Sequence, residues 1–86
     1  MVELKATLKL YASLGDYLPA GARNNKIAID VAEQTSISSI IEQFNLPIKM
    51  VHLVLVDGVY IHPNERDKRV LLPGESLAIW PPVAGG

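Results

Sequence analysis

The 86-residue sequence predicts an α+β fold in which one helix packs across one face of a mixed sheet of about five strands. Two observations support this prediction. Residues 2–10 and 26–31 alternate between apolar and polar side chains, which is the period of a strand with one buried face. From residue 35 the apolar period becomes that of a helix, and strand patterns return after residue 50. The expected order is strand, strand, helix, strand, short strand, strand.

Both strand segments before the helix have an apolar face. That face consists of Val2, Leu4, Ala6, Leu8 and Leu10 in residues 2–10, and of Ile27, Ile29 and Val31 in residues 26–31. Gly15, Pro19 and Gly21 lie between them and indicate a long, partly irregular turn over residues 11–25. Two neighbouring strands joined without a helix pair most simply as an antiparallel hairpin.

The helix segment has its apolar residues at positions i, i+3, i+4 and i+7, namely Ile37, Ile40, Ile41 and Phe44. Thr35 or Ser36 can supply the N-cap oxygen, and Pro47 prevents continuation past about residue 46. Because β-branched isoleucine is a moderate helix former, we expect this helix to be stabilised by packing its apolar face on the sheet.

The second half of the chain predicts three more strands. Residues 51–56 are almost all apolar, Asp57-Gly58 is a type I′ turn signal, and residues 59–61 return as a short strand. Pro73-Gly74 makes a turn into a final strand over residues 76–80. If the first and last strands pair in parallel at the centre, the arrangement is the β-grasp, or ubiquitin-like, fold. We expect one domain over residues 1–80 and a flexible functional tail over residues 81–86.

Composition excludes several classes of chemistry. The chain has no cysteine, so disulfides, thiolate catalysis and iron–sulfur clusters are absent. His52 and His62 lie in no ligand pattern, and we expect no bound metal or cofactor. A formal net charge of −1 gives no reason to expect nucleic acid or a membrane as partner. With no signal peptide or transmembrane run, we expect a cytoplasmic protein that is not catalytic alone.

A polar loop over residues 62–69 carries three basic residues, Arg66, Lys68 and Arg69. Solvated charge is the simpler interpretation of this cluster. The alternative is a partner-docking role, for which Arg66 and Arg69 are the candidate residues.

Residues 81–86 predict an extended C-terminal segment that leaves the sheet. Pro81 and Pro82 stop the final strand, because proline has no backbone donor and a fixed φ. The side chains then shrink through Val83 and Ala84 to Gly85-Gly86, and six extended residues reach about 20 Å. If Leu77 and Ile79 face the helix, Trp80 faces the other side of the sheet. There it anchors an interface or, alternatively, closes the core at one end.

Three segments closely resemble the MoaD/ThiS family of sulfur carriers. They are Asp57-Gly58-Val59-Tyr60, the run from Leu72 to Ile79, and the ending Trp80-Pro81-Pro82-Val83-Ala84-Gly85-Gly86. The resemblance covers the chain in length and element order. Its ending leans toward the small subunits of molybdopterin synthase.

The resemblance implies that the chemistry takes place on Gly86. A ubiquitin-activating-type adenylyltransferase would use ATP and Mg to adenylate the Gly86 carboxylate, and sulfur from a persulfide donor would give a thiocarboxylate. Gly85 would be a steric requirement, and residues 80–84 would bind partners. A sulfur-accepting enzyme, such as the large subunit of molybdopterin synthase, would take the sulfur.

Three alternatives remain open at this point. The sulfur could serve thiamine or amino-acid biosynthesis instead. The protein could be a ubiquitin-like modifier conjugated to lysines, which needs the same tail. It could also be a non-reactive β-grasp binding module whose Gly-Gly end is incidental.

Overall fold

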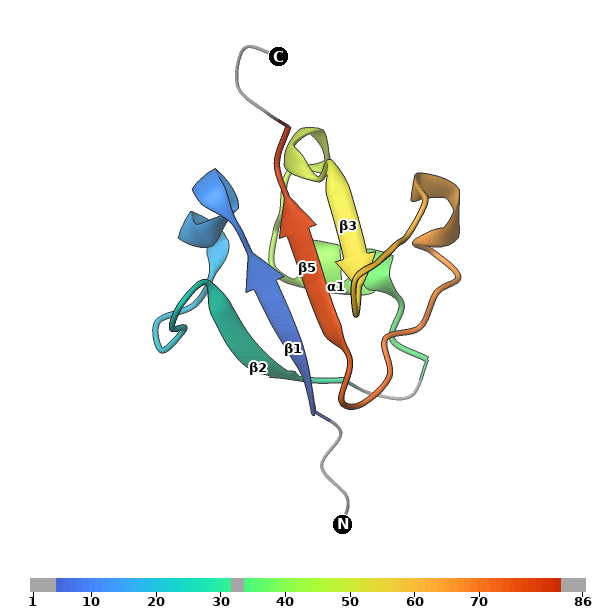
Figure 1. Ribbon diagram of the computed structural model, residues 1–86, viewed down its shortest axis with the longest axis horizontal. Helices are drawn as coiled ribbons and strands as arrows, with labels where there is room; N and C mark the ends of the chain where they lie inside the picture. Colours follow the sequence, from blue (N-terminus) through green and yellow to red (C-terminus); the bar gives the residue numbers. More distant parts are fainter. Residues whose placement is uncertain (1–4, 32–33, 83–86) are drawn as a thin grey trace.

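The computed structural model of the protein describes residues 5–31 and 34–82. One helix, α1 (Ile37–Gln43), crosses one face of a five-stranded sheet (Figure 1). The strands are β1 (Lys5–Leu10), β2 (Lys26–Asp30), β3 (Leu53–Val56), β4 (Val59–Tyr60) and β5 (Ser76–Trp80). Short 3-10 helices occupy Ala12–Tyr17, Ile48–Met50 and Pro63–Glu65. The predicted α+β class and element order are confirmed.

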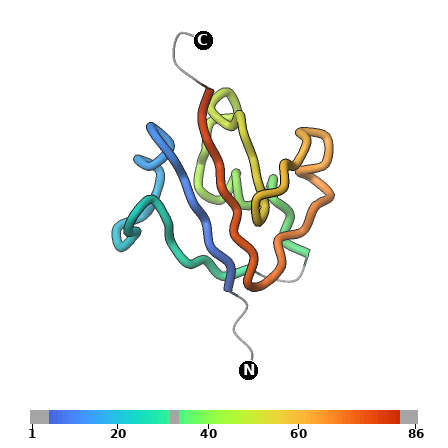
Figure 2. The backbone as a smooth tube through the Cα atoms, in the orientation of Figure 1, coloured from blue at the N-terminus to red at the C-terminus, as the bar shows by residue number. Residues whose placement is uncertain are grey.

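The sheet has the order β2-β1-β5-β3-β4, so the last strand of the chain lies at its centre. β1 pairs with β2 in antiparallel and with β5 in parallel orientation, with Leu8 opposite Leu77. On its other side, β5 pairs with β3 in antiparallel orientation. Figure 2 shows the blue β1 and the red β5 running side by side. The predicted hairpin and the parallel pairing of first and last strands are both confirmed.

The core lies between α1 and the sheet. Its most completely buried side chains come from β1, β3, β5, α1 and two connecting segments: Leu8, Leu10, Leu14, Ile37, Ile40, Val54, Leu71, Leu77 and Ile79. Three of the four predicted helix residues are buried as expected, with 0–4% of Ile37, Ile40 and Ile41 exposed. Phe44 is half-buried, because it is the C-cap residue at the margin of the core. Val2 and Leu4 lie outside the described residues.

The helix ends earlier than predicted because its C-terminus forms a Schellman motif. Asn45 takes a left-handed φ of 58°, which ends the helix at Gln43 instead of near residue 46. Leu46 N donates to Ile41 O at 3.1 Å, and Asn45 N donates to Glu42 O at 3.0 Å. At the other end, Ser36 Oγ accepts a hydrogen bond from Ser39 N, as the N-cap prediction requires.

Two tight turns lie at the ends of the outer strands. Asp57 and Gly58, with φ of 49° and 84°, join β3 to β4 in the predicted type I′ geometry. Asn24 and Asn25, with φ of 53° and 64°, form a second turn of this kind at the start of β2. The segment expected to be irregular therefore ends in a hairpin turn.

Candidate functional site

The predicted tail begins at one end of the central strand. β5 ends at Trp80, followed by a half-buried Pro81 and an exposed Pro82. Strands β1 and β3 hold β5 on both sides, so the point at which the chain leaves the sheet is rigidly placed. Val83, Ala84, Gly85 and Gly86 lie outside the described residues. Their proposed roles, the flexibility of the tail and the division at residue 80 all stay predictions.

Trp80 stacks on Tyr11. Their ring centroids are 4.3 Å apart and the ring planes differ by 4°. The stack is supported from the backbone: Tyr11 N donates to Ile79 O and His52 N donates to Trp80 O, both at 3.1 Å. Trp80 faces the open side of the sheet, since its neighbours Ile79 and Leu77 are buried under α1. The predicted orientation is confirmed, and the interface role stays a prediction.

A shallow groove of about 350 Å³ runs along the open face from this stack. Its lining includes Tyr11, Leu55, Ala78 and Trp80, with Lys9, Asp57, Gly58 and Ser76 at its polar parts. We call it the open-face groove. Leu53 lies opposite Trp80 in the register and Tyr60 opposite Leu55, and both are exposed apolar residues. The groove therefore combines an aromatic stack with an apolar floor, next to the predicted tail.

Arg66 is buried, which corrects the solvated interpretation for this residue. Only 8% of it is exposed. Its Nε donates to Ile61 O at 3.2 Å, while its Nη2 is buried without a hydrogen-bond partner among the described residues. Its carbonyl accepts from Ser38 N, so the residue connects the loop to the start of α1. Lys68, in contrast, is exposed as expected.

Arg69 forms an intramolecular ion pair with Glu75. Its Nη2 lies 2.7 Å from Glu75 Oε2, and its Nη1 donates to Glu75 Oε1 at 3.2 Å. Arg69 Nη1 also donates to Val70 O, and Glu75 Oε1 accepts from Leu72 N at 2.7 Å. The hydrogen bond from Arg69 lowers the pKa of Glu75 and raises that of Arg69.

The two candidate arginines do not join the groove. Glu75 immediately precedes β5, so its pair with Arg69 lies at the opposite end of that strand from Trp80. Each arginine has a structural contact that accounts for its position, and their proposed partner-binding role stays a prediction.

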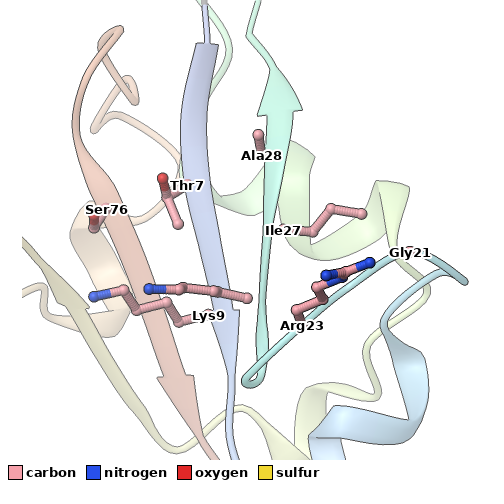
Figure 3. A pocket seen from close by; sticks show the side chains of 8 residues that line it. Thr7, Lys9, Gly21, Arg23, Ile27, Ala28 and Ser76 are labelled. Carbon is pink, nitrogen blue, oxygen red and sulfur yellow. The ribbon is translucent and has the colours of Figure 1, made fainter.

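Two features of the site were missed by sequence reasoning. One is Tyr11, whose contact with Trp80 depends on the parallel pairing of β1 and β5. The other is a basic pocket, lined among others by Lys9, Arg23 and Lys26, beside the edge strand β2 (Figure 3). The Asn24-Asn25 pair was a usable signal for the second, because a type I′ turn places its flanking residues, Arg23 and Lys26, opposite each other.

The described part of the chain contains neither a cluster of metal ligands nor a membrane-spanning helix. There, no three or more His, Asp or Glu side chains gather as a metal site would require. No helix within residues 5–31 and 34–82 has the length and apolar character to cross a membrane. The exposed His62 contacts the Tyr60 ring edge-on, with centroids 4.8 Å apart.

The fold and the central placement of β5 define a ubiquitin-like protein, as the sequence predicted. Residues 3–84 match the sequence model of the family described as Mut7-C ubiquitin, and the chain belongs to this family. The crystal structure of SAMP1 from Haloferax volcanii is similar, with a TM-score of 0.66 and 21% sequence identity over 95% of this chain and 99% of that chain. At this identity the similarity establishes the fold. No curated protein matches the sequence.

Proposed function

We propose that this protein is a ubiquitin-like sulfur carrier that is activated at Gly86. The observation that supports this most is the placement of β5. A central strand leads directly into Pro81-Pro82-Val83-Ala84-Gly85-Gly86, beside a groove with an aromatic stack. Membership of a ubiquitin-like family supports the same assignment. In this proposal the folded domain is the part that partner enzymes bind, and the reactive group is the Gly86 carboxylate.

The proposed chemistry needs an activating enzyme. A carboxylate is a poor electrophile, and its mixed anhydride with AMP supplies a good leaving group. The partner adenylyltransferase would bind ATP and Mg and release pyrophosphate when the acyl-adenylate forms. The outer sulfur of a persulfide donor would then displace AMP to give an acyl disulfide, and a second thiol of the partner enzyme would reduce it, leaving a thiocarboxylate on Gly86 and a disulfide on the partner. Gly85 serves here by its small size, because glycine allows close approach in a narrow channel.

Partner recognition is assigned to the open-face groove. Trp80 and Tyr11 form a large, rigid aromatic surface next to Pro81, and aromatic residues are enriched in interface hot spots. A sulfur-accepting enzyme that docks there would receive the tail in its own active site. The resemblance of the ending to small subunits of molybdopterin synthase favours molybdopterin biosynthesis as the recipient pathway. Thiamine and amino-acid biosynthesis are the alternatives.

The test is an activation assay read by intact mass. The 86-residue chain is incubated with a cognate activating enzyme, ATP, Mg and a sulfur donor. The expected product has one oxygen exchanged for sulfur. Deleting Gly86, or extending the chain past Gly86 by one alanine, should abolish the exchange without changing the melting temperature. If either variant still gains the sulfur, the proposal fails, because the chain has no cysteine to hold it.

A second function, that of a ubiquitin-like modifier, is favoured by the family description as a ubiquitin. It uses the same activation but transfers the Gly86 acyl group to lysine. Conjugates that contain an isopeptide bond from Gly86, without accumulation of thiocarboxylate, would establish this function. A chain that is inert toward every activating enzyme would instead be a binding module.

A further inference from the structure

The two edge strands of the sheet, β2 and β4, differ in length. The opposite edge strand, β4, has two residues, whereas β2 has five. At the start of β2, Arg23 and Lys26 exchange both backbone hydrogen bonds, at 3.0 and 3.1 Å. These bonds lie on the side of β2 that faces away from β1. The segment before the Asn24-Asn25 turn thus pairs with the outer edge of β2 at Arg23. Its preceding described residues form no further pairs with β2.

The backbone of Ala28 is left open on that side. Backbone groups of successive residues in a strand point to alternate sides, so Ala28 presents its N–H and C=O on the same outer side as Lys26. Among the described residues, none forms a backbone hydrogen bond with Ala28 on the outer side of β2. Its side chain is exposed. A donor and an acceptor are therefore available together.

A basic pocket of about 450 Å³ lies next to this open backbone. Figure 3 shows Thr7 and Lys9 on β1, Ala28 on β2, and Gly21 and Arg23 on the adjoining segment. Lys26 completes the set of three cations, and no carboxylate lines the pocket. The ion pairs found within the described residues, Lys5–Asp30 and Arg69–Glu75, involve none of the three.

We propose that this edge docks an extended, acidic segment of a partner protein, which adds a strand beside β2 at Ala28. Backbone hydrogen bonds to Ala28 give the strand its register, and carboxylates at alternate positions face Lys9, Arg23 and Lys26. Lysine on an edge strand discourages pairing with neutral or basic strands. The same charges select an acidic one. The proposal does not depend on the sulfur chemistry at Gly86.

Two other occupants fit the observations less well. A nucleic acid backbone can use the three cations and the N–H of Ala28, but phosphate cannot donate to the open C=O. A second copy of this chain, pairing β2 with β2 in antiparallel orientation about Ala28, would set Lys26 of each copy opposite Asp30 of the other, but Asp30 already pairs with Lys5, and Lys9 and Arg23 would gain no carboxylate. An acidic peptide satisfies the donor, the acceptor and the charges at once.

The test is an NMR titration of the ¹⁵N-labelled 86-residue chain with a blocked hexapeptide of alternating glutamate and valine. We expect saturable shifts at the amides of residues 21–28, weakened by added salt. Lys26→Glu should weaken binding by about tenfold or more. The matched control, Lys49→Glu, changes an exposed lysine in the 3-10 helix Ile48–Met50 and should leave the affinity unchanged.

A second arm tests the backbone contacts without altering the protein. Two further peptides keep the charge and are N-methylated on alternate residues, one on each edge of the strand. The peptide methylated on the edge that faces β2 loses its donor to Ala28 and should not bind, whereas the peptide methylated on the other edge should still bind. Binding by both peptides would overturn the strand-addition geometry. The proposal is also overturned if an alternating lysine–valine peptide binds equally well, or if oligouridylate binds this edge and the acidic peptide does not. Concentration-dependent dimerisation by sedimentation, abolished by Lys26→Glu, would instead identify a second copy as the occupant.

Discussion

The two faces of the sheet carry different kinds of side chain on the same strands. Toward α1, Val54, Leu77 and Ile79 are completely buried. On the other face, Leu55 and Trp80 line an open groove, one residue away along the chain. The side chains of the buried face are closely packed, so few substitutions are tolerated there. The open face is under no such constraint, so its aromatic and basic residues are available for partners.

The largest expected effect is on the covered face. Ile41→Ala in α1 and Ile79→Ala in β5 remove apolar groups from two layers of one core. Only 4% of Ile41 and 0% of Ile79 are exposed. Each should lower the free energy of unfolding by about 2–5 kcal/mol, measured by urea denaturation. A loss below about 0.5 kcal/mol for Ile41→Ala would mean that the helix face contributes little to the core.

Trp80→Ala should cost less stability than Ile79→Ala, although tryptophan is the larger side chain. The partly buried ring loses its stack on Tyr11 and part of its burial, together about 1–2 kcal/mol. Trp80→Phe, which keeps an aromatic ring, is the matched control. If Trp80→Ala destabilised the protein as much as Ile79→Ala, the open face would be part of the core.

Glu75→Gln tests a polar contact at the end of the sheet. It should lower stability at pH 7 by about 1 kcal/mol, because the carboxylate pairs with Arg69 in a bidentate arrangement. The pKa of Glu75 is lowered from 4.5 on folding, so this stabilisation is present above pH 4.5. It is lost as the pH falls through the folded-state value. A wild-type to variant difference that grows toward acid pH would contradict the assignment.

The smallest expected effect belongs to the exposed cross-strand pair. Lys5 Nζ lies 2.7 Å from Asp30 Oδ1, with 46% and 82% of the two side chains exposed. Asp30→Asn should change the free energy of unfolding by about 0.5 kcal/mol or less, since exposed pairs are weak. Added salt should remove even this difference between wild type and variant in thermal melts. A large effect would mean that the open face contributes to folding through its charges.

The elements were predictable because each depends on local physics. Period-2 and helical patterns identified the strands and α1, and the Asp57-Gly58 signal located a type I′ turn that the structure confirms. The boundaries were less predictable. The helix ends at Gln43 because Asn45 takes a left-handed φ, which asparagine adopts more readily than most residues but not always.

The candidate site was predictable in part. The orientation of Trp80 followed from strand alternation, which needs no information beyond β5 itself. The burial of Arg66 did not follow, because it depends on the carbonyl of Ile61 and on the packing of its loop against α1. A charged residue in a polar loop gives no sign from sequence that the fold will enclose it.

By itself, the sequence determined which segments form strands, where α1 begins, and that Pro81-Pro82 ends β5. These features depend on dihedral preferences and on residues within a few positions of one another. The tertiary structure alone decided that Tyr11 stacks on Trp80, that Arg66 is enclosed, and that no other described strand pairs with the outer edge of β2 at Ala28, beside three cations. Those features require strand order and register, which arise from burying one shared core and bring together residues far apart in the chain.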